Sequence, residues 1–393
     1  MKLIDLRSDT VTKPDKNIIE EALLAELGDD EYGEDPTVNN LQEKCAELLG
    51  FESGLFVSSG LMGNQISLLI HNSPGTEVIT TSDSHIKNYE HGAASFLSRV
   101  QFREIDHKDG ALNLDTIKSV YEKSKVHKPQ IKTIAQENTH LASGGSIVSY
   151  NHLAEVHSFA KEKGINVHID GARLWHAILG EGSTTNYGNI SDSLTFCFSK
   201  ALGAPIGSML LGSKAFITEA REYRKILGGG MRQVGVIASM ANKSLDLRER
   251  ILEDHQKAKD VFDFISEKQE FDTFFKAEYK NTNMIFLKFS DGANSQNFIK
   301  NLEKEGVLSG LINDKTVRLV FHKDVSTDDL EHVKEKIYSS SLIWFHSVID
   351  FSERLTKIIV PIKDERLTTN IYRAISLKQS LLESAKQNAF PKR

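Results

Sequence analysis

Short apolar runs alternate along the chain with stretches in which apolar residues recur at helical spacing. The apolar runs end near Ser58, Thr81, Glu137, Asp170 and Ser199. This alternation is typical of a parallel sheet whose strands are joined by crossover helices. Because ligands of open parallel sheets bind at the carboxyl ends of the strands, we expect the polar residues after these runs to meet at one edge.

Beyond about residue 245 the pattern changes. A long helix leads into strand-like runs at 283–287 and 317–321, with helices near 297–305 and 328–337. We therefore expect an α/β protein with a large domain containing a mostly parallel sheet, and a smaller α+β domain. The segments are an arm with a helix (1–45), the large domain (46–250), the small C-terminal domain (251–338) and a basic extension (339–393).

Composition excludes several classes of protein. With 393 residues, 39% of them hydrophobic, the chain can bury a large core. A net charge of -6 without a long basic block argues against a nucleic-acid partner, and no run approaches a membrane span. Cys45 and Cys197 alone make no disulfide framework, and we expect no metal. Asp5 and Asp9 leave no room for a secretory signal, so the cytoplasm is the expected compartment.

One ammonium group, that of Lys200, interrupts an apolar stretch. Residues 196–198 read as a buried strand, and Gly203 and Gly207 predict turns after the lysine. A dry pocket disfavours the charged form of an amine, and a neutral amine forms a Schiff base with a carbonyl, including the aldehyde of pyridoxal phosphate. The alternative is a lysine that reaches the surface from a strand end.

A carboxylate, that of Asp170, closes the strand that contains Val167 and Ile169. Pyridoxal phosphate needs a carboxylate at such a strand end, because it keeps the ring nitrogen protonated and the ring able to accept electrons. The alternative for Asp170 is a helix N-cap before Ala172. Asp170 and Lys200 together are more specific than either residue alone.

A phosphate-binding turn is predicted at residues 54–65, which read as a strand, a turn and a helix. Ser59 and the backbone of Gly60 and Leu61 are the expected donors, because N–H groups at a helix N-terminus attract anions. An ordinary strand-to-helix loop would look the same.

Two imidazoles and two guanidinium groups complete the candidates. His85 and His140 each follow a predicted strand, where a lone histidine is usually a surface or core residue. Arg232 follows a glycine cluster, and Arg318 lies in a predicted strand, where it either faces solvent or binds a carboxylate.

The chain resembles the low-specificity L-threonine aldolases, pyridoxal-phosphate enzymes of the aspartate aminotransferase fold, over roughly residues 3–338. Six motifs match in order: Ile4 to Thr12, Asp29 to Val38, Glu137 to His140, Asp170 to Arg173, Ser199 to Ser208 and Gly228 to Gln233. The resemblance implies the pyridoxal-phosphate-dependent transferase fold, known as fold type I.

The resemblance also implies site roles around the cofactor. Lys200 would carry it as a Schiff base, Asp170 would pair with the pyridine nitrogen, and His85 would stack on the ring. His140 would lie near the substrate hydroxyl. Arg173 would reach the site as well, as a ligand shared by cofactor and substrate.

For the substrate carboxylate, the resemblance implies Arg173, Arg318 and Ser8, since a planar guanidinium binds both oxygens. Lys225 and Arg232 would reach the cofactor phosphate across a subunit boundary. Tyr32 would likewise enter a neighbour's site, so a homotetramer or at least a homodimer is implied.

Two features depart from the family pattern. Leu61 stands where the family usually has threonine after the glycine of the phosphate turn, which removes a hydroxyl donor. The family pattern stops near Ile337, but the chain continues with nine Lys and Arg against five Asp and Glu in residues 338–393. The apolar residues 342–345 indicate that this tail begins by packing, while the alternative is a disordered extension.

The implied reaction is retro-aldol cleavage of a β-hydroxy-α-amino acid, such as L-threonine or L-allo-threonine, to glycine and an aldehyde. His140, through water, is the expected base for the β-hydroxyl, unless the cofactor phosphate or solvent shares that role. The alternatives are another pyridoxal-phosphate-dependent lyase or aminotransferase on the same scaffold, and a non-catalytic relative.

Overall fold

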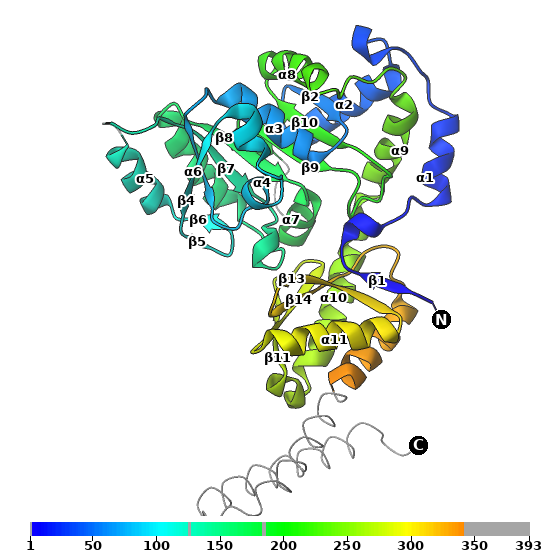
Figure 1. The fold of residues 1–393 in the computed structure, drawn as a ribbon. Coiled ribbons are helices and arrows are strands. Elements are labelled where there is room, and N and C mark those ends of the chain that lie inside the picture. The colour runs from blue at the N-terminus through cyan, green and yellow to red at the C-terminus, as the bar shows by residue number, and fades with distance from the viewer. Residues whose placement is uncertain (1, 125–126, 183–185, 342–393) are drawn as a thin grey trace, which may run out of the picture.

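The structure, a computed structural model, describes residues 2–124, 127–182 and 186–341. A larger domain built on a seven-stranded sheet lies against a smaller domain built on a five-stranded sheet (Figure 1). The predicted packing of residues 342–345, and the tail as a whole, lie outside the described residues.

The sheet of the large domain is mostly parallel, as the sequence predicted. Its order is β2 (Ser53–Val57), β10 (Ser208–Gly212), β9 (Ser193–Cys197), β8 (Asn166–Gly171), β7 (Ile131–Glu137), β3 (Glu77–Thr81) and β4 (Gln101–Ile105). Strand β10 runs antiparallel to both of its neighbours, and the other pairs are parallel. The sequence pattern did not predict β4 and β10. Strand β10 follows the 203–207 turn so closely that its apolar run reads as part of the turn.

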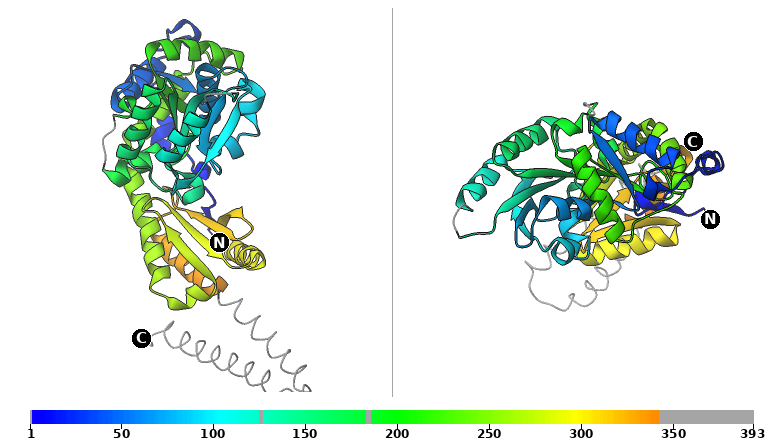
Figure 2. Two further views of the ribbon diagram at one scale, coloured as in Figure 1. Left: turned by 90° about the vertical axis from the view of Figure 1, so that its left-hand side faces the viewer. Right: turned by 90° about the horizontal axis from the view of Figure 1, so that it is seen from above.

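Helices cover both faces of this sheet (Figure 2). They are α2 (Pro36–Leu49), α3 (Gly60–His71), α5 (Leu114–Lys123), α6 (Tyr150–Glu162), α7 (Leu174–Glu181), α8 (Lys214–Ile226) and α9 (Gly235–Asp246). Helix α2 shows how the sequence sets the ends: the Asp35 carboxylate caps its first turn, and Gly50 ends it at a φ of 73°. No helix in the described part of the chain is long and apolar enough to cross a membrane.

The small domain contains the sheet β1 (Ile4–Leu6), β13 (Val307–Asn313), β14 (Thr316–Val320), β12 (Met284–Phe289) and β11 (Phe275–Tyr279). Its helices are α10 (Ile251–Ser266), α11 (Gly292–Lys304) and residues 327–341.

Residues 1–45, which the sequence pattern groups as one arm, divide between the two domains. The first strand, β1, pairs with β13 in the small domain. The predicted helix over residues 15–27 is shorter, with α1 at Lys16–Glu20 followed by a 3-10 turn at Glu21–Leu23. Helix α2 packs on β2 of the large domain. The N-terminal segment therefore ties the two domains together beside the sheet edge described next.

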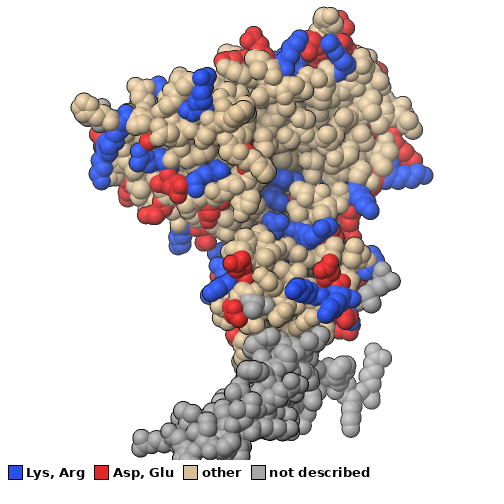
Figure 3. All heavy atoms as spheres, in the orientation of Figure 1, with Lys and Arg blue, Asp and Glu red and all other residues tan. Residues whose placement is uncertain are grey.

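The carboxyl ends of five strands meet at one edge of the large sheet. Strands β3, β7, β8 and β9 are parallel, and β2 runs with them because it and β9 are both antiparallel to β10. The residues that follow these ends are those that the sequence singled out. In space-filling view, Lys and Arg side chains gather where the two domains meet (Figure 3).

Candidate active site

The carboxylate of Asp170 lies at the end of β8 with both oxygens in hydrogen bonds. Oδ1 accepts from the backbone N–H of Ala172 at 3.1 Å, and Oδ2 accepts from Nδ2 of Asn64 at 2.8 Å. The hydrogen bond from Ala172, which corresponds to the N-cap alternative, therefore uses only Oδ1 of Asp170. The second oxygen is held by a side chain of α3, which crosses over β8.

The same amide nitrogen of Asn64 also donates to Oε1 of Glu90, at 2.9 Å. Glu90 is fully buried and lies 3.2 Å from Nδ1 of His85, the first residue of the short helix α4 (His85–Asn88). Burial lowers the pKa of His85, but the hydrogen bond with Glu90 and the charge of Asp170 outweigh it and leave this pKa raised. His85 also stacks on Tyr89, with 5.7 Å between ring centroids.

The half-buried Lys200 follows β9. Its charge is felt at both Asp9 and His85, where it lowers the pKa. Within the described residues, Nζ of Lys200 has no hydrogen bond or ion pair. Such an amine is free to react, in contrast to Lys323, which is held by two carboxylates.

The predicted phosphate turn begins α3. The hydroxyl of Ser59 accepts from the N–H of Met62 at 3.2 Å, so it acts as the N-cap. A side chain at Gly60 would come within 2.8 Å of Sγ of Cys197, which explains why this helix start requires glycine against β9. The N–H groups of Gly60 and Leu61 are among the four that no helix can satisfy internally, and Leu61 is 38% exposed.

Arg173 forms a buried bidentate ion pair with Asp9, at 2.9 and 2.6 Å. The charge and hydrogen bonds of Arg173 outweigh burial and hold the pKa of Asp9 well below its usual range. Two of the donors of Arg173 are thus already used inside the protein. The carboxylate of Asp9 was not predicted as part of the site.

Arg318, on β14, lies beside this pair. Burial and the charge of Arg173 lower its pKa to about 10. Its Nη2 donates to the backbone oxygen of Arg7 at 2.8 Å, but its Nε is buried without a hydrogen-bond partner in the described part of the chain. An anion would satisfy this donor. Ser8 turns its hydroxyl toward Thr10, capping the 3-10 turn Asp9–Val11.

His140 is fully buried, and both ring nitrogens have partners among the described residues. Nδ1 lies 2.9 Å from the hydroxyl of Ser143, and Nε2 lies 3.0 Å from that of Thr81 and 3.5 Å from Asp83. Burial lowers the pKa of His140 to about 4. The ring is therefore neutral and turned into the protein.

Asp83, His107 and His140 offer three potential metal ligands within 4.8 Å of one another. However, Nδ1 of His107 accepts from the N–H of Gly110 at 3.0 Å, so a neutral ring carries its proton on Nε2. That nitrogen lies 3.1 Å from Oδ1 of Asp83, a buried oxygen without a hydrogen-bond partner in the described part of the chain, and as an N–H group it offers no lone pair to a metal. The arrangement favours a polar contact over a metal site.

Glu137, at the end of β7, is a further buried carboxylate. Its oxygens accept from the N–H groups of His85 at 2.8 Å and Leu141 at 2.9 Å. Burial and the charge of Asp170 raise its pKa to about 7. It ties the loops after β3 and β7 together.

The residues predicted to act across a subunit boundary lie at the acidic loop of residues 28–37. Lys225 pairs with Glu31 at 2.8 Å and Arg232 with Asp29 at 3.2 Å. Tyr32, in the same loop, is 76% exposed. These side chains form one exposed group beside the acidic loop.

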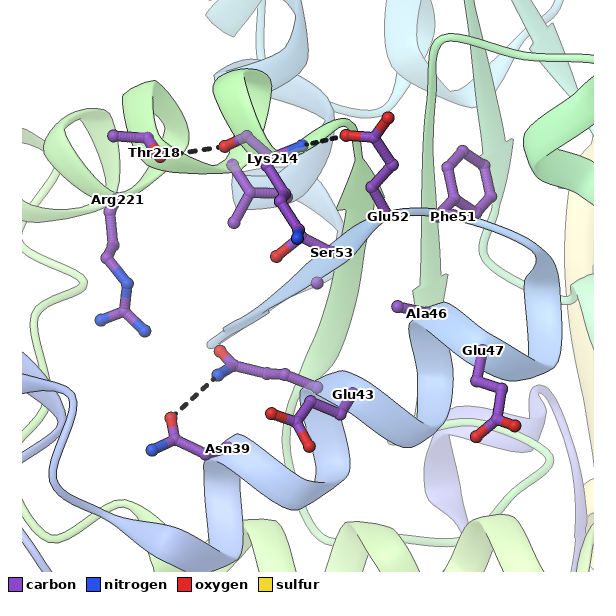
Figure 4. A pocket seen from close by; sticks show the side chains of 13 residues that line it. Asn39, Glu43, Ala46, Glu47, Phe51, Glu52, Ser53, Lys214, Thr218 and Arg221 are labelled. Carbon is purple, nitrogen blue, oxygen red and sulfur yellow. Dashed lines mark hydrogen bonds between the residues drawn. The ribbon is translucent and has the colours of Figure 1, made fainter.

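A separate groove of about 760 Å³ lies between α2, the start of β2 and α8 (Figure 4). Ser53 lines it at the amino end of β2, whereas the phosphate turn follows the carboxyl end of that strand. Ligands of open α/β sheets bind at carboxyl ends, so this groove is not the candidate site.

Three buried residues of the site were missed in the sequence: Asp9, Asn64 and Glu90. Asp9 lies in the matched motif Ile4 to Thr12, but its partner Arg173 lies 164 residues away along the chain, and the neighbouring Arg7 pairs with Asp5 instead. Asn64 and Glu90 carry no signal either, because their partners lie 106 and 26 residues away along the chain.

Comparison with known proteins identifies the family of the chain. Residues 5–290 match the family described as beta-eliminating lyase. The chain is 38% identical to low-specificity L-threonine aldolase 1 of Arabidopsis thaliana over 84% of this chain and 94% of that one. It is 36% identical to low specificity L-threonine aldolase of Escherichia coli, over 84% of this chain and 97% of that one.

Among solved structures, threonine aldolase of Leishmania major superposes with a TM-score of 0.72 at 18% identity, covering 86% of this chain and 99% of that one. The predicted pyridoxal-phosphate-dependent transferase fold, fold type I, is thereby confirmed. The matches to the family and to these relatives together cover both domains. The chain therefore belongs to the beta-eliminating lyase family and groups with its low-specificity L-threonine aldolases.

Proposed function

We propose that this protein is a pyridoxal-phosphate-dependent aldehyde lyase that cleaves L-threonine and L-allo-threonine to glycine and acetaldehyde. The observation that carries the proposal is the convergence of Asp170, Lys200 and His85 at one sheet edge. The identity of 36–38% with threonine aldolases supports the choice of substrate.

The residues present fit the cofactor. The amine of Lys200, which has no partner among the described residues, can attach the cofactor aldehyde. Asp170 can face the ring nitrogen, and the first N–H groups of α3 can hold the phosphate. Pyridoxal phosphate, when bound, supplies an electron sink that stabilises the carbanion left after the Cα–Cβ bond breaks.

Within this site, the protein side chains hold the substrate. We assign the substrate carboxylate chiefly to Arg318, because its buried Nε lacks a partner among the described residues, whereas Arg173 is engaged by Asp9. Arg173 then fixes the N-terminal segment, including Ser8, beside that carboxylate.

The two histidines receive different tasks in this proposal. One face of the His85 ring contacts Tyr89, and the other can lie against the cofactor ring while Nε2 holds a proton or a water near the substrate hydroxyl. His140 can act on the hydroxyl only if its ring leaves Thr81 and Ser143.

We further propose a homodimer or homotetramer in which each subunit completes a neighbour's site. The exposed group of Tyr32, Lys225 and Arg232 supports this arrangement, because it brings two cations and one phenol to a single surface. Such cations would suit a phosphate held by a neighbouring subunit.

The test has two parts, cofactor attachment and reaction products. We expect the purified full-length protein to show a visible absorption band, and borohydride to fix the cofactor on Lys200 by mass mapping. We expect Lys200→Ala to lack the covalent label while it keeps the fold by circular dichroism. Cleavage of both threonine isomers should yield glycine and acetaldehyde. A label on another lysine, or 2-oxobutanoate as the main product, would contradict the proposal.

A further inference from the structure

A line of buried polar side chains runs from Asp170 away from the candidate site, between α3 and the sheet. Asn64 donates to Asp170, and Oδ1 of Asn64 lies 3.0 Å from Nε2 of His168. Nδ1 of His168 lies 2.9 Å from the hydroxyl of Ser193, which lies 2.8 Å from Nε2 of His71. The chain crosses from β8 to β9 and ends on the last turn of α3.

The surroundings fix the direction of every proton along this line. Because Nδ2 of Asn64 faces two carboxylates, the amide cannot be turned round without placing its oxygen against theirs. Its oxygen must then accept from His168. Burial lowers the pKa of His168 to about 3, so the ring is neutral and carries its single proton on Nε2.

The remaining links follow from this tautomer. Nδ1 of His168 has no proton, so it accepts from the hydroxyl of Ser193, whose oxygen accepts in turn from His71. All donors thus point toward Asp170. A chain with one direction polarises each successive bond, and a buried network of this kind is lost if one link is reversed.

The amide of Asn64 also joins two parts of the site. Its two N–H bonds reach Asp170 at 2.8 Å and Glu90 at 2.9 Å. Asp170 would face the ring nitrogen, and Glu90 holds the imidazole that would stack on the ring. A second amide, that of Gln65, donates to the other oxygen of Glu90 at 2.6 Å. The side chain of Asn64 therefore sets the spacing between Asp170, which would lie in the plane of the cofactor ring, and His85, which would stack on it.

We propose that Asn64 and His168 are positioning residues, which keep the side chain of Asp170 aimed at the cofactor ring nitrogen and couple it to the Glu90–His85 pair. This rests on the proposed function, since it assumes the cofactor. His168 acts on Asp170 only through Asn64. A substitution of His168 therefore tests the positioning of Asp170 without removing a side chain that would touch the cofactor.

The experiment compares His168→Gln with His168→Asn in the full-length holoenzyme. In His168→Gln, the amide nitrogen lies near the position of Nε2 and still donates to Asn64. In His168→Asn, the amide reaches only the position of Nδ1, so the donor to Asn64 is lost. Both variants are buried amides of similar cost to the fold. Ser67→Ala is the matched control, because Ser67 is buried on the same helix but donates only to the backbone of Gly63.

We expect His168→Asn to lower kcat about tenfold with a smaller change in KM, the factor that corresponds to one hydrogen bond at a buried site. We also expect the pH midpoint of the visible cofactor band to rise by about one unit, since a less firmly protonated ring nitrogen makes the attached nitrogen more basic. His168→Gln should stay closer to the wild type in both, and Ser67→Ala should leave the midpoint unchanged.

Equal effects of the two His168 variants on the band midpoint would overturn the proposal, since a purely structural histidine predicts no difference between them. A wild-type protein without any visible band would instead overturn the proposed function. The two failures are thus distinguishable.

Discussion

The loops after β3 and β7 each begin with a polar residue at the same sheet edge, and each contains a histidine, yet the two imidazoles have opposite surroundings. His85 is held by the buried Glu90 and keeps part of its ring open. His140 is sealed between two hydroxyls and Asp83, which is 40% exposed. The sequence presents them as equivalent, and the structure does not.

The difference lies in where the carboxylate partner sits. A carboxylate excluded from water interacts strongly with a nearby imidazole, so the pKa of His85 is raised despite burial. A partly exposed carboxylate is screened, so burial prevails at His140 and lowers its pKa to about 4. The loop after β3 can therefore carry a charge at the site, whereas the loop after β7 supplies a neutral, fixed ring.

Glu90→Gln should break this contrast most strongly. An amide cannot accept from His85, Asn64 and Gln65 together, so we expect a loss of about 1–3 kcal/mol in unfolding free energy and a lower pKa for His85. A histidine with a raised pKa stabilises the fold below its unfolded pKa and loses this effect as pH rises through the folded value. The deficit should thus be larger at pH 6 than at pH 9, measured by urea unfolding.

Glu104→Gln is the control for this variant. Glu104, on β4, pairs with Lys87 of the loop after β3, but 48% of the Glu104 side chain is exposed. We expect a change below about 1 kcal/mol that does not depend on pH in this range. A His85 resonance that titrates identically in Glu90→Gln and wild-type protein would refute our account of its pKa.

His140→Gln should alter the response of stability to acid. Because the folded pKa of about 4 lies below the unfolded value, the neutral ring stabilises the fold above about pH 6.5, and this contribution is lost as pH falls toward 4. Removing the titrating group should make the loss between pH 6 and pH 5 smaller by about 1 kcal/mol.

Thr81→Val serves as the comparison, since it deletes a partner of Nε2 and leaves the histidine in place. We expect its unfolding free energy to be lower by about 1 kcal/mol at both pH values. If His140→Gln and wild-type protein show the same slope between pH 6 and pH 5, the ring is not neutral in the folded state.

The main outline of the site could be read from the sequence. The strand ends at Thr81, Glu137 and Asp170 were predicted, because apolar runs that end in polar residues mark buried parallel strands. The parallel direction then brings those ends together without any knowledge of side-chain contacts. Local periodicity is sufficient for this part of the fold.

The partners of each site residue could not be read in the same way. Asn64 looks like an ordinary polar residue of an apolar helix, and only the crossing of α3 over β8 places it against Asp170. Likewise, the pairing of Arg173 with Asp9 depends on where the N-terminal segment passes between the domains. Such contacts are set by tertiary packing, which leaves no periodic signal.

Asp83→Asn is the variant with the smallest expected effect. Asp83 lies 3.1 Å from Nε2 of His107 and 3.5 Å from Nε2 of His140, but its partial exposure limits the loss to below about 1 kcal/mol in urea unfolding. Because its charge is what partly offsets burial at His140, the pKa of that histidine should fall further.

Stoichiometric zinc distinguishes this polar contact from a metal site. We expect zinc to leave the melting temperatures of wild-type and Asp83→Asn protein unchanged, since the Gly110 N–H holds Nδ1 of His107 as an acceptor and keeps the proton on Nε2. A rise of several degrees in the wild type that Asp83→Asn abolishes would show instead that the loop at Gly110 yields its hydrogen bond to a metal, and would make the loop after β7 an ion site.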